Sequence, residues 1–229
     1  IDPGEAEKTL KYLRVNDLKL DAILITHHHF DHTGGIGDML KFSNNIDVFG
    51  PNNNISNINK RLKDGDTLNI IGIEFQIIEI PGHTLDHIAY YSPNKGNPIL
   101  FCGDTLFASG CGRVFEGTFE KMHHSLQKLK ALPVKTKIYA GHEYTESNLK
   151  FALEVEPLNQ NIISRYNEVK KLTNKGIPTL PSSLELELKI NPFLRCETKE
   201  VQNSVIKQFN TSKNENAIFK ALRQWKDNF

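Results

Sequence analysis

The sequence has 229 residues, of which 38% are hydrophobic and 24% are charged, a composition that can bury a core and excludes general disorder. Lys and Arg number 28 against 27 Asp and Glu, so the net charge of +1 gives no electrostatic case for binding nucleic acid. No apolar run approaches the roughly 18 residues that a membrane-spanning helix needs, so we expect neither a nucleic-acid partner nor a membrane protein.

The cysteines and the first residues bear on where the protein works. Three cysteines without paired spacing argue against a disulfide framework and favour a reducing compartment, so we expect a cytoplasmic protein. The opening Ile1-Asp2-Pro3-Gly4 looks like the tail of a strand whose beginning lies outside this sequence. We therefore expect the N-terminal strands and any targeting segment to be missing, which leaves an organelle as the alternative compartment.

Short apolar runs separated by turn residues fill the first two thirds of the chain. They predict β-strands, and two amphipathic segments predict helices at about 35–42 and at 119–132, where Pro133 ends the second. Ile71-Gly72 indicates a tight hairpin. The strands are predicted at 22–26, 46–49, 67–71, 73–80, 87–91, 99–103 and 137–140.

Beyond residue 142 the periodicity becomes helical. The proline-rich segment 177–198 predicts a loop with an extended stretch at 184–190. On the last predicted helix an apolar stripe leaves Arg223 and Lys226 off the buried face. We therefore expect a first domain at 1–150 and a helical domain at 151–229, with helices at 145–155, 159–174, 199–209 and 215–227.

Four potential metal ligands follow the first strand within six residues: His27, His29, Asp31 and His32. Alternate residues that leave a strand end point the same way, so His27 and His29 can converge on one ion. Asp31 and His32, just past the turn, can then reach a second ion. Imidazole and carboxylate ligands without a thiolate suit a catalytic ion such as Zn, Fe or Mn.

Three further strands end in a Gly that is followed by a potential ligand: His83, Asp104 or His142. Gly lets the backbone turn tightly where the ligand side chain must face inward. Alone, each of the three would more often be a capping or surface residue. Together with the first motif they supply enough ligands for two ions that share a bridging carboxylate, an arrangement with metals about 3.5–4 Å apart that serves hydrolysis.

The pattern HxHxDH followed by PGHT, GDT and GHEYT resembles the metallo-β-lactamase superfamily. Within it the chain is similar over essentially its whole length to glyoxalase II, the hydroxyacylglutathione hydrolases. The stretches that carry this likeness include THHHFDHTGG, FCGDTLF, GCGRVFEG, NPFLR and the tail FKALRQWKDNF. The resemblance implies an α+β fold, an αββα sandwich with a C-terminal helical, glutathione-binding domain. It also implies a thioester hydrolase that converts S-D-lactoylglutathione to D-lactate and glutathione in methylglyoxal detoxification.

The resemblance further implies two divalent ions, most often Zn with Fe or Mn as alternatives, and a set of residues around them. The first ion would be held by His27, His29 and His83, and the second by Asp31, His32 and His142. Asp104 would bridge the ions, and both aspartates would serve catalysis. Glutathione would bind at five positions, in a monomer or weak dimer: Arg113, Phe115, Tyr144, Arg223 and Lys226.

Three of the substrate positions are less secure from the residues themselves. Phe115 stands where a Tyr usually helps to hold the peptide, so the missing hydroxyl is expected to weaken glutathione binding. Arg223 and Lys226 share a helix face and can act together on a carboxylate. From spacing alone, however, an ordinary solvated basic face is favoured by about two to one, and only the resemblance reverses that preference.

Two other functions stay open at this point. A mononuclear iron enzyme that oxidises glutathione persulfide would keep the fold but need only three ligands, and the tail with Arg223 and Lys226 counts against it. A non-catalytic member of the fold is opposed by the presence of all seven ligands and supported by the missing strands.

The remaining histidines and cysteines carry weaker signals. We expect His28 to be a supporting residue that points away from the metals, and His87 either to support the site or simply to start a strand. His123 and His124 are expected on the surface. Cys102 should be inert in a strand core, and Cys111 has no base adjacent in sequence.

Overall fold

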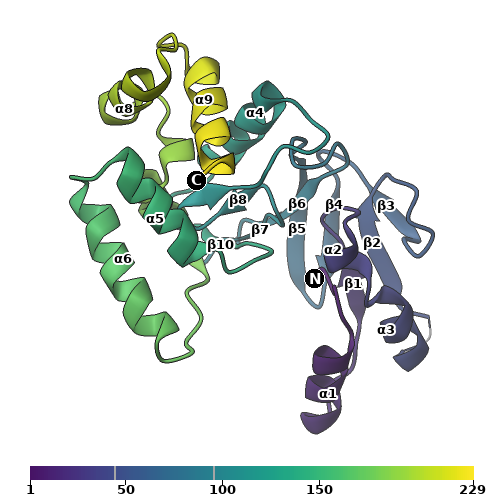
Figure 1. Cartoon of the computed structure of the whole chain (residues 1–229). Coiled ribbons are helices and arrows are strands. Elements are labelled where there is room, and N and C mark those ends of the chain that lie inside the picture. The colour runs from purple at the N-terminus through teal and green to yellow at the C-terminus, as the bar shows by residue number, and fades with distance from the viewer. Residues whose placement is uncertain (44, 95) are drawn as a thin grey trace.

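Two β-sheets form the centre of the molecule and lie face to face (Figure 1). The computed structural model describes residues 1–43, 45–94 and 96–229. Within these residues the smaller sheet is parallel, in the order β1-β2-β3, and consists of Ala22–Leu24, Asp47–Pro51 and Lys60–Leu62. The larger sheet is mixed, in the order β11-β10-β7-β6-β5-β4, and consists of Ser182–Ser183, Lys137–Tyr139, Ile99–Phe101, Ile88–Ser92, Ile73–Glu79 and Thr67–Ile70.

Three hydrophobic clusters order the layers as helix, sheet, sheet and helix. The first packs two helices against the outer face of the smaller sheet around Val48. The second fills the space between the sheets around Tyr90, whose hydroxyl donates to the carbonyl of Ile25. The third packs a helix against the larger sheet around Leu126. The helices in these layers are α1 (Glu7–Val15), α3 (Ile36–Phe42) and α4 (Phe119–Lys130).

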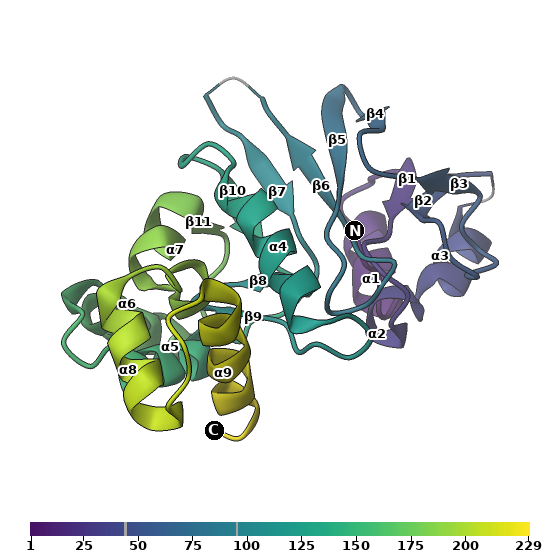
Figure 2. The same cartoon turned by 90° about the horizontal axis from the view of Figure 1, so that it is seen from above.

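The C-terminal helices pack on the same cluster as α4. Phe151, Phe193 and Leu222 are fully buried in it, and α4 and α9 lie side by side in both views (Figure 1, Figure 2). The helical third therefore shares its core with the larger sheet. Its elements are α5 (Thr145–Val155), α6 (Gln160–Thr173), α7 (Leu184–Ile190), the 3-10 helix η1 (Pro192–Leu194), α8 (Lys199–Phe209) and α9 (Glu215–Asp227).

The strands and helices predicted from the sequence are confirmed, with ends shifted by at most two residues, and the αββα sandwich with a helical C-terminal part is confirmed as well. The hairpin at Ile71-Gly72 is also present, where both residues have the positive φ angles, 48° and 80°, that a two-residue turn needs. Several elements were not predicted: α1, the short helix α2 (Phe30–Thr33), β3, β11, η1 and the hairpin of β8 (Leu106–Phe107) and β9 (Gly110–Cys111).

The prediction of an extended stretch at 184–190 is wrong, because these residues form α7. Their alternating Leu and Glu residues imitate a strand. The hydroxyl of Ser183 instead accepts a hydrogen bond from the Leu186 N–H and caps a helix, and Glu187 turns into the core. Only the two residues of β11 are extended there.

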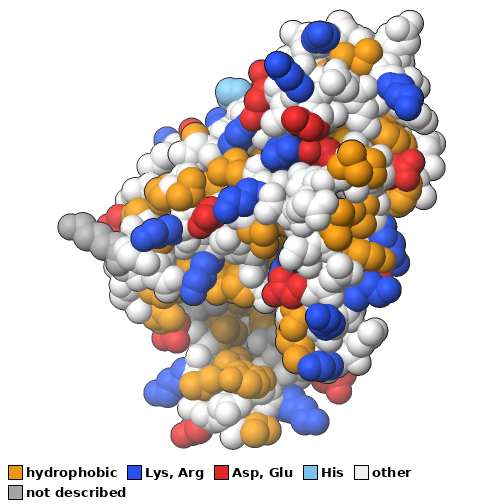
Figure 3. All heavy atoms as spheres, turned by 90° about the vertical axis from the view of Figure 1, so that its left-hand side faces the viewer, with side chains coloured by type: hydrophobic (Ala, Val, Ile, Leu, Met, Phe, Trp, Pro, Cys, Tyr) orange, Lys and Arg blue, Asp and Glu red, His pale blue; other side chains and the backbone are white. Residues whose placement is uncertain are grey.

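Charged side chains of both signs are interspersed over the face that lies on the left of Figure 1 (Figure 3). This mixture agrees with the balance of 28 basic and 27 acidic residues. Within 1–43, 45–94 and 96–229, none of the helices has both the length and the apolar character that crossing a membrane requires.

Leu222→Ala should lower the free energy of unfolding by about 2–5 kcal/mol, because this fully buried side chain of α9 fills the cluster shared with the sheet. The single Trp of the chain, Trp225, lies on α9, and circular dichroism reports on the whole chain, so both signals should change in one coincident transition. Lys220→Ala, an exposed position of the same helix, is the matched control. A Trp transition that precedes the other would show that the helices unfold separately from the sheets.

Candidate metal centre and substrate pocket

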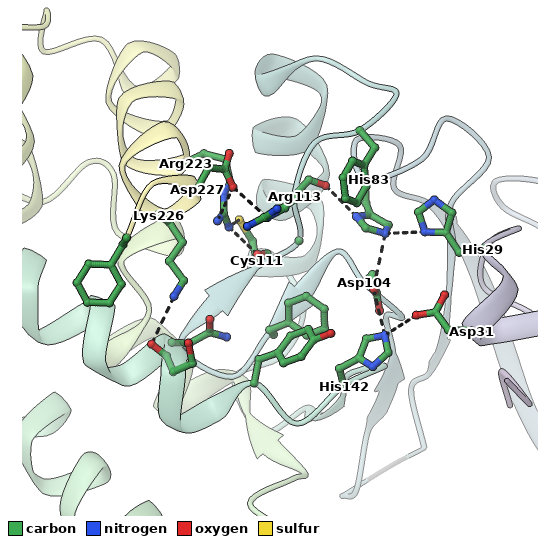
Figure 4. A pocket seen from close by; sticks show the side chains of 17 residues that line it. His29, Asp31, His83, Asp104, Cys111, Arg113, His142, Arg223, Lys226 and Asp227 are labelled. Atoms are coloured by element: carbon green, nitrogen blue, oxygen red, sulfur yellow. Dashed lines mark hydrogen bonds and ion pairs between the residues drawn. The ribbon is translucent and has the colours of Figure 1, made fainter. Parts of the chain in front are cut away.

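Five of the seven predicted metal ligands line one pocket of about 570 Å³ (Figure 4), and the other two, His27 and His32, lie beside His29 and Asp104. His27 and His29 follow β1, His83 follows β5, Asp104 follows β7 and His142 follows β10. The short helix α2 (Phe30–Thr33) adds the two remaining ligand candidates, Asp31 and His32. The seven residues that the sequence places at strand ends are therefore brought together.

Three imidazoles form the first group. The Nε2 atom of His27 lies 3.2 Å from Nδ1 of His29, which lies 3.1 Å from Nε2 of His83. Nitrogens that bind one tetrahedral Zn²⁺ at their usual distance are roughly 3.3 Å apart, so this spacing suits a shared ion. The other ring nitrogen of His83 lies 2.8 Å from the carbonyl oxygen of Arg113, a contact that orients the ring.

The two buried rings of this group are in the form that binds metal. Burial, together with the neighbouring His87 and His32, lowers the pKa of His27 well below its usual range. Burial also lowers the pKa of His83. Both imidazoles are therefore neutral at pH 7 and offer a lone pair.

Asp31, His32 and His142 form the second group. One carboxylate oxygen of Asp31 lies 3.2 Å from Nε2 of His142 and 3.8 Å from Nε2 of His32. Nδ1 of His32 lies 3.1 Å from a carboxylate oxygen of Asp2 on its other side. The ligand atoms of the group lie within 4.8 Å of one another, close enough for one ion.

Asp104 lies between the two groups. Its Oδ2 is 3.6 Å from Nε2 of His83 and 3.4 Å from Nε2 of His142, and its Oδ1 is 3.3 Å from Nε2 of His32. Burial alone would raise the pKa of Asp104, but the imidazoles of His142 and His32 beside its carboxylate hold that pKa well below its usual range. A Cβ at Gly141 would collide with Oδ1, so glycine is required beside this carboxylate.

The buried polar atoms of this centre fit a divalent cation. Among the described residues, both ring nitrogens of His32 and Oδ1 of Asp104 are buried and make no hydrogen bond. Asp2 and Asp104 lie within 3.3 Å of the His32 ring, but not with the alignment of a hydrogen bond. Buried polar atoms in native proteins almost always have partners, and a metal ion between the two residues would satisfy Nε2 of His32 and Oδ1 of Asp104.

A cationic wall closes the other end of the pocket (Figure 4). Arg113 comes from the segment after β9, and Arg223 and Lys226 come from α9. Asp227 lies among them, 3.0 Å from Nη2 of Arg223 and 3.5 Å from Nε of Arg113. The end of the pocket opposite the histidines therefore suits an anionic ligand.

The prediction that Arg223 lies off the buried face is wrong, since only 3% of this residue is exposed. Its Nη1 donates to the carbonyl of Cys111 at 2.7 Å, and its guanidinium lies over the ring of Phe193. The charge is buried because Asp227 pairs with it. Lys226 is half-buried beside it and contacts the Ser147 carbonyl at 3.4 Å.

Two aromatic residues line the pocket against the histidines of the metal end. Phe115 is 62% exposed, and its ring packs edge-on against His29 and His83. The ring of Tyr144 stacks on His142 with centroids 5.1 Å apart. The structure thus places all five predicted substrate residues on the pocket wall.

The supporting residues differ partly from expectation. His28 points to Asp86 and Glu116 at 2.9 and 3.1 Å and away from the first group, as predicted. His87 is fully buried and accepts a hydrogen bond from the Asp104 N–H at 3.1 Å. The prediction that His123 lies on the surface is wrong. Its ring is buried because it stacks on Phe219 and hydrogen-bonds Asn216 and Gln127.

Sequence reasoning missed several other residues that line the pocket. Asp227 could have been found, because it lies four residues after Arg223 on the same helix face. The others come from a hairpin and helix ends whose approach the local sequence does not reveal: Phe107, Cys111, Gly112, Ser147, Asn148 and Phe229.

Two family models together match the whole chain. The model for the metallo-β-lactamase superfamily matches residues 1–142, and the model for the hydroxyacylglutathione hydrolase C-terminus matches residues 143–229. The hydroxyacylglutathione hydrolase of Photobacterium profundum is 48% identical over 231 residues, which cover 100% of this chain and 89% of that protein. The enzyme of that name from Pseudomonas aeruginosa (strain LESB58) is 47% identical over 232 residues with the same coverage.

Solved structures share the fold at lower identity. The crystal structure of ETHE1 from Myxococcus xanthus is 24% identical with a TM-score of 0.61, covering 96% of this chain and 82% of that one. That of the BLEG-1 B3 metallo-β-lactamase is 23% identical with a TM-score of 0.61, covering 84% and 86%. The metallo-β-lactamase fold implies divalent-metal binding, which the His and Asp groups suit. With relatives at 48% and 47% identity along its full length, the chain belongs to the hydroxyacylglutathione hydrolase family of the metallo-β-lactamase superfamily.

Proposed function

We propose that this protein hydrolyses S-(2-hydroxyacyl)glutathione, typically S-D-lactoylglutathione, to the 2-hydroxy acid and glutathione, as a step of methylglyoxal detoxification. The observation that carries the proposal is that a metal-suited histidine and aspartate cluster and a cationic wall face each other across one pocket. Such a pocket can hold a substrate with a reactive group at one end and carboxylates at the other. The names of the full-length relatives support the same reaction.

The metal end would hold two divalent ions, most often Zn²⁺. His27, His29 and His83 would hold the first, Asp31, His32 and His142 would hold the second, and Asp104 would be shared. When bound, such ions lower the pKa of water to about 7 and so supply hydroxide at neutral pH.

The chain's own residues would orient the reaction. Asp31 lines the pocket beside His142, so its carboxylate can accept a hydrogen bond from the attacking water. Asp104 stays ionised and keeps the histidines of both groups facing one centre. The net reaction adds water to the thioester carbonyl and releases the glutathione thiolate, a good leaving group because the pKa of a thiol is far below that of an alcohol.

The cationic end would bind glutathione. Arg113, Arg223 and Lys226 can pair with its carboxylates, and Tyr144 and Phe115 can pack against the peptide between them. We propose that residues 1–150 form the catalytic domain and residues 151–229 the glutathione-binding domain, with Arg113, Phe115 and Tyr144 of the first domain completing the glutathione site. We also propose a monomer or weak dimer. A cytoplasmic location is supported by the three cysteines, all in the described part of the chain, which are free and buried.

A mononuclear persulfide dioxygenase is the second candidate. The likeness to ETHE1 at 24% identity supports its fold and nothing further. The second group of Asp31, His32 and His142 disfavours it. A mononuclear site needs only three ligands and would leave this group without an ion. Hydrolysis of S-D-lactoylglutathione without consumption of oxygen distinguishes the two activities.

Asp104→Ala should remove at least one bound ion per chain and reduce turnover about a hundredfold or more, because it removes the carboxylate nearest to both groups. Metal analysis of the purified protein and a lactoylglutathione assay measure the two effects. Asp38→Ala, at an exposed position on α3, is the matched control. Two ions per chain and normal turnover in Asp104→Ala would show that Asp104 is not shared.

Lys226→Ala should raise KM for S-D-lactoylglutathione about tenfold or more, because one charge-assisted hydrogen bond to a carboxylate is worth roughly 1.5–3 kcal/mol. Metal content should not change, since Lys226 lies at the opposite end of the pocket from the histidines (Figure 4). Lys220→Ala removes an exposed positive charge from the same helix and should leave KM unaltered. If KM is the same in both variants, Lys226 does not bind the substrate.

The pH dependence of kcat/KM offers an independent check on Lys226. Burial and the nearby charges of Arg223 and Arg113 lower the pKa of Lys226 to about 8. The ammonium is therefore lost above pH 8, and kcat/KM should fall as the pH rises through that value. Lys226→Arg stays charged and should keep kcat/KM constant to higher pH, after subtraction of spontaneous hydrolysis. Identical alkaline profiles would assign the fall to another group.

A further inference from the structure

Glu187 is a buried carboxylate that the proposed reaction does not use. It lies on α7, in the helical third, and is 0% exposed. Its Oε2 accepts hydrogen bonds from the Ser109 N–H at 2.7 Å and from Nδ2 of Asn191 at 3.0 Å, and its Oε1 accepts one from the Ser182 hydroxyl at 2.5 Å. A carboxylate is retained in such a place only when its oxygens are satisfied, so these contacts define its orientation.

The target of Glu187 is the hairpin of β8 and β9. Ser109, in the turn of this hairpin, has a φ of 56°, a left-handed conformation that is strained for a residue with a side chain. Its N–H is held by Glu187, while Nδ2 of Asn191 donates to the carbonyls of Phe107 and Gly110 at 3.2 and 3.0 Å. Side chains of the helical third thus fix a turn that the hairpin's own sequence does not favour.

The same hairpin carries part of the substrate end of the pocket. The carbonyl of Cys111, in β9, accepts the hydrogen bond from Nη1 of Arg223 at 2.7 Å (Figure 4). The ring of Phe107, in β8, packs edge-on against Tyr144 with centroids 5.2 Å apart. A displaced hairpin would therefore move a cation and an aromatic wall that face the substrate.

We propose that Glu187 is a positioning residue for glutathione: it holds the hairpin 106–111 so that Cys111 orients Arg223 and Phe107 supports Tyr144. This role rests on the proposed function, and it assigns part of the enzyme's substrate specificity to a residue outside the pocket. Glu187 is not among the residues that line the pocket. It acts through the hairpin and touches neither the substrate nor the metal ligands.

The metal end also has anchors outside this hairpin. The Asp104 N–H donates to His87, and the Gly141 N–H donates to the Gly103 carbonyl at 2.8 Å, so these ligand segments are tied to each other and to the larger sheet. Loss of Glu187 should therefore weaken glutathione binding while metal content and saturated turnover remain close to those of the wild type. A role confined to general stability would produce no such division between KM and kcat.

Glu187→Met is the informative variant, because it keeps the volume and removes both oxygens. KM for S-D-lactoylglutathione should rise about tenfold, as for one lost charge-assisted contact. The hydrolysis of a lactoyl thioester of a small neutral thiol should be unaffected. Glu187→Gln should restore KM, because its carbonyl oxygen can still accept from Ser109 and Asn191 while its amide donates to Ser182. Glu185→Met, an exposed position on the same helix, is the matched control.

Asn191→Ser provides a second route if Glu187→Met does not fold. It removes the amide donor to Phe107 and Gly110, places no charge beside Glu187 and keeps a hydroxyl that can cap the Phe193 N–H, and it should raise KM in the same way. An unchanged KM in a folded, metal-loaded variant would overturn the inference, as would a fall in kcat and metal content at constant KM. A wild type that does not hydrolyse S-D-lactoylglutathione at all would instead overturn the proposed function.

Discussion

Imidazole and carboxylate lone pairs converge at one edge of the sandwich, and the surrounding elements hold them there. His27, His29, His83 and Asp104 form a chain of ligand atoms in which neighbours lie 3.1 to 3.6 Å apart. Buried lone pairs that face each other are unfavourable unless a cation lies between them. The proposed divalent ions would supply that cation. The flanking glycines leave room for the ligand side chains, and the ring of His87 accepts a hydrogen bond from the Asp104 N–H.

The helical third contributes to the other end of the pocket without separating from the sandwich. Its side chains enter the hydrophobic cluster of the larger sheet, and its polar groups reach the β8–β9 hairpin through Glu187, Asn191 and Arg223. Because the hairpin follows Asp104 by two residues, the two ends of the pocket are joined by a short covalent path as well as by packing.

The sequence alone predicted most of the fold and the composition of the site. Strand-end glycines followed by His or Asp, together with the first motif, identified the seven ligand candidates, because the direction of side chains at a strand end is a local property. The helix at 184–190 was missed because its alternating Leu and Glu residues imitate a strand. The burial of Arg223 and His123 could not be predicted, since it depends on Asp227, Phe193 and Phe219 packing across the fold.

Titration of the metal-free wild-type protein with Zn²⁺ would show whether the two ligand groups bind two ions that act together. Bound metal per chain and the initial rate of S-D-lactoylglutathione hydrolysis would be measured in the same samples. The geometry of the two ligand groups around Asp104 predicts that two ions bind per chain and that hydrolysis reaches its maximum only when both are present. Full activity with one ion per chain, or two bound ions without hydrolysis, would contradict the account.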